Sequence, residues 1–154
     1  MKVKPAHTTY ALADTIELFP GLTMKVLLGS KETNGLQAIF EDIVDPGVGL
    51  SRHIHHQQDE TFIFLEGIFD VEVDGERYRM TAGDVAFIPK GSVHAWKNVG
   101  TTQGRLRYIF SPALNIEKMF RELDEFRKSG EFTDELAQEL AAKYPEQETV
   151  GPPL

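Results

Sequence analysis

The sequence predicts an all-β protein, an antiparallel sandwich or barrel, followed by two C-terminal α-helices. Three observations support this fold class. Up to Pro112, short apolar runs recur about every 8 to 12 residues between turn signals, which is typical of antiparallel β proteins. Asp74-Gly75 separates two of these runs and predicts a type I′ hairpin turn. After Pro112 the apolar period becomes helical.

The expected strands follow one another along the first two thirds of the chain. Residues 24–28 (MKVLL) and 36–44 (LQAIFEDIV) flank a tight turn at Asn34-Gly35, and the second run ends before Pro46. The later strands are expected within residues 61–67, 69–80, 82–91, 93–100 and 105–112.

Two helices are expected after the strands. The first begins after Asn115 as N-cap and ends at Gly130. Its apolar face consists of Ile116, Met119, Phe120, Leu123 and Phe126. The second is expected within residues 132–144, with Thr133 as its cap, and the tail at 145–154 (PEQETVGPPL) is expected to be irregular.

Length and continuity indicate one domain. A chain of 154 residues buries roughly 70% of its unfolded surface around a single core, and no internal repeat or low-complexity linker divides it. We expect an N-terminal arm with the first strands at 1–35, a barrel at 36–112, and helices with a tail at 113–154.

Composition excludes several function classes. The formal net charge is −8 and no stripe of Lys and Arg is present, so neither nucleic acid nor an anionic membrane surface is an expected partner. No window reaches the 18 apolar residues of a membrane span, and no secretory leader is recognisable, so we expect a cytoplasmic protein. Since the chain has no Cys, any metal must be held by nitrogen and oxygen.

The stretch HIHHQQDE, residues 53–60, contains the candidate metal ligands. On an extended strand His53 and His55 point to one face and His56 to the other. A short bend would return Glu60 toward the pair, and His94 could meet them from a later strand across the barrel interior. Three imidazoles and a carboxylate suit one divalent Fe, Mn, Co, Ni, Cu or Zn ion. A polar barrel mouth that holds no metal is the alternative.

The spacing around these residues resembles the paired motifs of the cupin family. The first pattern, G-x5-H-x-H-x4-E-x6-G, runs from Gly47 to Gly67, and the second, G-x5-P-x-G-x2-H-x3-N, runs from Gly83 to Asn98. The resemblance covers roughly residues 36–112. It implies a cupin-type double-stranded β-helix, a jelly-roll barrel, in which a divalent metal is held by His53, His55, Glu60 and His94. Asn98 is expected to stabilise the fold, and RYIFSP with the GPPL ending is similar, less specifically, to small quercetinase-like cupins.

Strand alternation predicts an aromatic interior that is either a substrate pocket or simply barrel core. If Glu60 points inward, so do the following side chains: Phe62, Phe64, Trp96, Tyr108 and Phe110. By the same alternation, four arginines are expected to point outward: Arg77, Arg79, Arg105 and Arg107. The entrance could be rimmed by His56, Gln57, Gln58, His7 and Tyr10, although the sequence favours plain surface positions for all five.

Three functions remain open at this level. A dioxygenase for an aromatic or enol-bearing small molecule would use Glu60 as a ligand or as a general base. A non-redox isomerase or lyase, and a metal-dependent module that binds or senses a small molecule without catalysis, are the alternatives. The apolar helix face is expected either to cover the barrel or to join a partner subunit, and a homodimer is the expected assembly.

Overall fold

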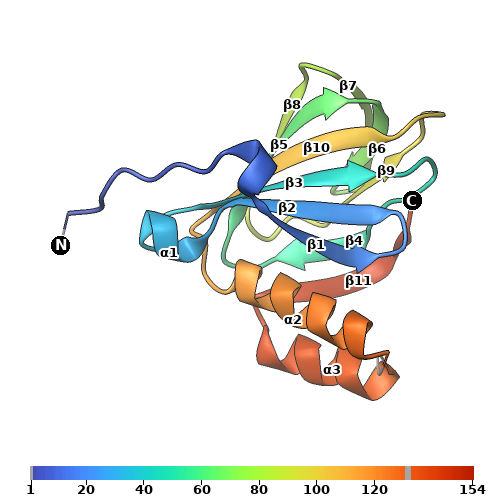
Figure 1. Cartoon of the computed structure of the whole chain (residues 1–154). Coiled ribbons are helices and arrows are strands. Elements are labelled where there is room, and N and C mark those ends of the chain that lie inside the picture. The colour runs from blue at the N-terminus through green and yellow to red at the C-terminus, as the bar shows by residue number, and fades with distance from the viewer. Residues whose placement is uncertain (1, 131–132) are drawn as a thin grey trace.

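The protein folds into two antiparallel sheets that face each other as a jelly-roll barrel, with two helices along one side (Figure 1). The structure is a computed structural model that describes residues 2–130 and 133–154. The fold is mostly β and consistent with a double-stranded β-helix, as the sequence predicts.

The first sheet has the strand order β1-β2-β3-β10-β5-β8. Its strands are β1 (Asp14–Phe19), β2 (Leu22–Leu28), β3 (Ala38–Val44), β10 (Gly104–Ser111), β5 (Asp59–Glu66) and β8 (Val85–Ile88). The second sheet has the order β11-β4-β9-β6-β7. Its strands are β11 (Gln147–Pro153), β4 (Ser51–His55), β9 (His94–Asn98), β6 (Ile68–Val73) and β7 (Glu76–Thr81). All pairings are antiparallel, and β8 and β7 are edge strands.

The inner faces of the two sheets form an aromatic core. Phe40, Phe62, Phe64, Phe69 and Trp96 are fully or almost fully buried. Their positions follow from period-two alternation, because alternate residues of each strand point to the same face. The predicted outward direction of the four arginines is also confirmed, since their side chains are between 35% and 65% exposed.

Turn chemistry sets the strand connections. Asp74 and Gly75 both have positive φ, 49° and 86°, as the predicted type I′ turn requires. At Gly67 the φ of 91° is left-handed, and an added Cβ would lie 2.8 Å from the Cα of Gly104, so only glycine fits this position. Between β2 and β3 the chain forms the short helix α1 (Ser30–Thr33), which ends at the left-handed Asn34, in place of the simple tight turn expected there.

Both predicted helices are confirmed. Helix α2 (Ile116–Ser129) ends at the left-handed Gly130, and α3 (Asp134–Lys143) begins at Thr133, whose hydroxyl accepts a hydrogen bond from the Leu136 amide. Asn115 occupies the N-cap position of α2 but makes no side-chain cap bond. Phe132, at the start of the expected second helix, lies outside the described residues.

The apolar face of α2 covers the barrel of its own chain. The helix contacts β1, and the Phe120 ring packs edge-on against Phe40 with ring centroids 5.3 Å apart. Ile116 is buried, and Met119 packs against the same core. The sequence left open whether this face covers the barrel or contacts a partner subunit. The structure shows that Ile116, Met119 and Phe120 cover the barrel.

One expectation about the chain ends is wrong. Residues 147–153 are not irregular but form β11, which pairs with β4 at the edge of the second sheet. Residues 14–19 form β1, which lies in the region where the first strands were expected and extends the first sheet beyond β2. The N-terminal residues run away from the barrel before a 3-10 turn at Tyr10–Leu12 (Figure 1). Among the described residues, no helix has the length and apolarity to cross a membrane.

Candidate metal centre

The fold brings the four candidate ligands together between the sheets. His53 and His55 come from β4, His94 from the neighbouring β9, and Glu60 from β5 in the opposite sheet. One ligand atom of each lies within 4.8 Å of the others. His55, Glu60 and His94 are buried and His53 is partly exposed. His53 and His94 are direct register partners, so two of the rings stand side by side on the same sheet face.

Each imidazole is oriented by a hydrogen bond from its Nδ1. The His53 Nδ1–H donates to the Ser51 carbonyl at 2.7 Å, and the His94 Nδ1–H donates to the Ser92 carbonyl at 3.1 Å. The His55 Nδ1–H donates to Oε1 of Gln147 on β11. Since every one of these acceptors is an oxygen without a proton, all three rings carry a proton on Nδ1, and Nε2 is the atom through which each ring would bind a metal.

The donor set fits a divalent metal ion. His94 Nε2 lies 2.9 Å and His55 Nε2 lies 3.3 Å from the same atom, Oε2 of Glu60. The buried His55 Nε2 makes no hydrogen bond within the described residues, which is unusual for a buried polar atom. Three imidazole nitrogens and one carboxylate form a ligand group compatible with Fe, Mn, Co, Ni, Cu or Zn.

The electrostatics of the cluster favour the protonation states that metal binding needs at His53 and Glu60, and oppose them at His94. Burial, with the neighbouring His94 and His55, lowers the pKa of His53 to about 3, so this ring is neutral at ordinary pH. Burial raises the pKa of Glu60, but the His55 and His94 rings oppose it more strongly, and the pKa falls to about 2. Burial lowers the pKa of His94, and the hydrogen bond and charge of Glu60 more than reverse this, so its pKa is raised.

The five aromatic side chains predicted to line a pocket all point inward and are packed together. Phe62, Phe64, Trp96, Tyr108 and Phe110 are each at most 4% exposed. Phe110 lies against the His55 ring, with centroids 4.8 Å apart, and Phe62 lies 6.0 Å from the His94 ring. Their role in holding a substrate stays a prediction, because in this structure they fill the barrel.

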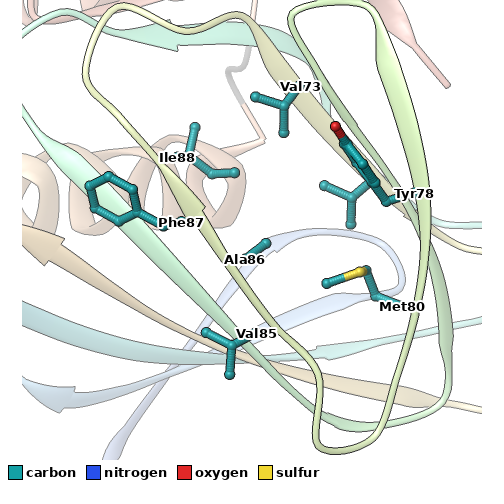
Figure 2. A pocket seen from close by; sticks show the side chains of 8 residues that line it. Val73, Tyr78, Met80, Val85, Ala86, Phe87 and Ile88 are labelled. Atoms are coloured by element: carbon teal, nitrogen blue, oxygen red, sulfur yellow. The ribbon is translucent and has the colours of Figure 1, made fainter.

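A cleft of about 280 Å³ opens where the two edge strands, β7 and β8, face each other (Figure 2). It is lined by Val71, Val73, Tyr78, Met80, Val85, Ala86, Phe87 and Ile88. Val73 is the register partner of His94, and Ile88 is the register partner of Glu60. Paired residues in antiparallel strands point to the same face. The inner end of the cleft therefore adjoins two of the clustered ligands.

Three polar residues of the interior were not identified as functional from the sequence. Gln58 is buried and donates to two backbone carbonyls, whereas the sequence placed it at the rim or the surface. Gln147 lies in the tail that was expected to be irregular, so no local signal indicated its contact with His55. Asp42 is buried on β3 and accepts a hydrogen bond from the Tyr108 hydroxyl at 2.9 Å.

The other proposed rim residues do not border the cluster in any contact that the structure shows. His56 pairs with Glu148 at the surface, with 2.7 Å between Nε2 and Oε2. Tyr10 donates to Glu41 on the outer side of the first sheet, where Arg105 and Arg107 bind the same carboxylate. Asn98 has the structural role expected of it, because its amide donates to the carbonyls of Val44 and Thr102.

Comparison with known proteins gives one family match. Residues 40–110 match the family described as Cupin domain. Those residues span β3 to β10 and include all four clustered side chains. An RmlC-like cupin from Shewanella frigidimarina has a similar structure, with a TM-score of 0.64 and 25% identity, over 76% of this chain and 99% of that one.

Two curated relatives show similarity over part of the chain. Polyketide synthase CurC from Streptomyces cyaneus is 33% identical over 70 residues, which is 46% of each chain. Quercetin 2,3-dioxygenase from Bacillus subtilis is 30% identical over 80 residues, which is 52% of this chain and 24% of that protein. The chain spans about half the length, or less, of these curated relatives.

Proposed function

The chain contains a cupin domain, and from this premise we propose that it is a metal-dependent dioxygenase for an uncharged aromatic or enol-bearing small molecule. The observation that carries the proposal is the apolar cleft beside the ligand cluster. Val73 and Ile88 line the cleft, and each is the register partner of a candidate ligand. The four clustered residues do not themselves line the cleft, so a molecule seated there would contact Val73 and Ile88, the neighbours of His94 and Glu60.

The four clustered residues would hold one divalent ion. When bound, the ion would supply Lewis acidity and one or two open coordination positions. The chain's own part is to present three Nε2 atoms in fixed orientation and one ionised carboxylate. The low pKa of Glu60 keeps it ionised, as both a ligand and a proton acceptor must be. The surrounding aromatic core excludes water from this group.

The cleft argues for an uncharged substrate. Its eight lining residues carry no charge, and the Tyr78 hydroxyl donates to Glu76 at its rim. A sugar phosphate or another small anion would need Arg, Lys or several amides to replace its lost hydration. Similarity to a quercetin dioxygenase agrees with an aromatic substrate.

Non-redox chemistry on the same class of compound is the second candidate. The similarity to polyketide synthase CurC favours it, because a polyketide is an enolisable carbonyl compound and the name specifies no oxidation. The two candidates share the metal, the cleft and the substrate class. They differ only in whether O2 is consumed.

The experiment that tests the function is O2 uptake by protein purified without chelators and loaded in turn with Fe, Mn, Co, Ni and Cu. Quercetin serves as the probe substrate. At least one metal form should consume O2 with the probe, and Glu60→Gln should lower the rate by about two to four orders of magnitude, the usual contribution of acid–base catalysis. Conversion without O2 uptake would favour the second candidate, and tight binding without turnover would favour a sensing module.

The cleft is tested separately by filling it. Ala86→Phe places a ring inside the cleft, whereas Ile68→Phe adds one at an exposed position of β6 that does not line it. Ala86→Phe should weaken quercetin binding at least tenfold and leave metal content unchanged, and Ile68→Phe should change neither. Equal binding by both variants would show that the substrate does not use this cleft.

A further inference from the structure

His55 differs from the other two histidines in what holds its ring. His53 and His94 each donate to the carbonyl two residues earlier, so their own chain segment orients them. His55 instead donates to Gln147, which lies 92 residues away on β11. The two residues are register partners in the β4–β11 pair, so both side chains point to the same face of the sheet.

The direction of the hydrogen bonds is set by backbone groups outside the cluster. Gln58 Nε2 donates to the Pro112 carbonyl at 3.0 Å and to the Ala113 carbonyl at 2.8 Å. Carbonyls only accept, so the Gln58 amide nitrogen must face them and its Oε1 must face away. Gln147 Nε2 donates to that Oε1 at 2.5 Å.

The same sequence of donors and acceptors determines the tautomer of the candidate ligand His55. Because the amide nitrogen of Gln147 donates to Gln58, Gln147 presents its Oε1 to His55. This oxygen only accepts, so His55 must carry its proton on Nδ1. In the neutral ring, Nε2 is then the nitrogen without a proton, and this atom of His55 is buried, without a hydrogen bond, among the clustered ligand atoms. Two backbone carbonyls at the end of β10 thus determine the tautomer of a ligand on β4.

We propose that Gln147 is a positioning residue of the metal centre, which holds His55 in the orientation and tautomer that a metal ion requires. Gln58 fixes Gln147 in turn. The helices α2 and α3 carry the chain from the end of β10 to the edge of β4, where β11 supplies this residue. This proposal rests on the proposed function only for its predicted effect on metal affinity. The tautomer of His55 is independent of that function, because it is a property of the metal-free protein.

Three variants of the full chain test it through metal affinity. Gln147→Leu removes the acceptor, Gln147→Glu keeps an acceptor for His55 but loses the bond to Gln58, and Glu148→Gln is the control on the same strand, where Glu148 contacts the exposed His56. The dissociation constant for Co(II) is measured by competition with a chelator, and the melting temperature of the metal-free protein is measured in parallel.

If Gln147 is a positioning residue, its variants should change Co(II) affinity and melting temperature independently of each other. Gln147→Leu should weaken Co(II) binding by about 10- to 100-fold, as loss of a partner behind a ligand usually does. Gln147→Glu should bind Co(II) within about threefold of the wild type or more tightly while melting at a lower temperature, and Glu148→Gln should bind like the wild type. If affinity falls equally in Gln147→Leu and Gln147→Glu, or remains unchanged in Gln147→Leu, the proposal is overturned.

Nitrogen NMR of the metal-free protein decides the tautomer even if no metal binds. With histidine labelled by 15N, His55 should show a protonated Nδ1 and an unprotonated Nε2 in the wild type, and a mixture of tautomers in Gln147→Leu. A His55 protonated on Nε2 in the wild type would refute the inference. Absence of Co(II) binding by a wild type with the expected tautomer would refute the proposed function alone.

Discussion

Replacing Phe64 by Ala tests whether the aromatic interior is core or pocket. Phe64 lies on β5 with an exposed fraction of 0%. Its ring packs against Phe69, with centroids 5.4 Å apart, and against Phe62, with centroids 6.2 Å apart. Removing the ring would leave a void among side chains that come from both sheets, which the barrel cannot close without moving strands.

The size of the effect follows from this burial. A Phe→Ala change in a packed core costs about 3–5 kcal/mol of unfolding free energy. For a domain of this size, each kcal/mol lowers the melting temperature by about 2–4 °C. The expected fall is therefore about 6–20 °C.

Thermal unfolding followed by circular dichroism measures it, with Phe87→Ala as the matched control. Phe87 lies on the adjacent strand β8 and is 62% exposed, so its removal should change the unfolding free energy by no more than about 0.5 kcal/mol. If Phe64→Ala melts within about 2 °C of the control, Phe64 borders open space. The aromatic pocket predicted from the sequence would then replace the edge cleft as the substrate site.

Three further predictions concern the ligands, a buried acid and the assembly. His94→Ala should lose bound divalent metal while the metal-free protein melts only a few degrees lower, and full metal occupancy measured by elemental analysis would contradict the ligand assignment. Burial raises the pKa of Asp42 well above 3.8 despite its hydrogen bond from Tyr108, so the folded state favours the protonated acid and stability falls as pH rises above that value. Asp42→Asn should therefore melt above the wild type at pH 8 and lose this advantage near pH 4, and an equal difference at both pH values would refute the argument. Exposed Val85 and Phe87 form an apolar surface on β8 that a second copy could cover, so sedimentation at micromolar concentration should show a homodimer, and a species of only 17.3 kDa would contradict it.

Much of the fold and most of the candidate site were accessible from the sequence because they depend on short-range chemistry. The alternation of His53 and His55 follows from strand geometry, and the turn at Asp74-Gly75 follows from the freedom of these residues to adopt positive φ. Thr133 and Gly130 bound helices for equally local reasons. The motif spacing placed His94 with the first group of ligands, and the structure brings them together.

The C-terminal strand could not be predicted in the same way. Residues 147–153 contain two prolines and a glycine and show no apolar alternation. They form a strand only because the edge of β4 offers them unpaired backbone groups. Strand formation here depends on a partner almost a hundred residues away, which no local pattern records.

The residues themselves thus determined the ligand types, their strand parity and the inward direction of the aromatic side chains. Only the tertiary structure decided that Gln58 and Gln147 stand behind His55, that Asp42 is buried, and that the cleft lies between β7 and β8. The physical reason is that side-chain direction follows from backbone geometry over two or three residues. Which side chains meet depends instead on which strand edges the whole chain brings together.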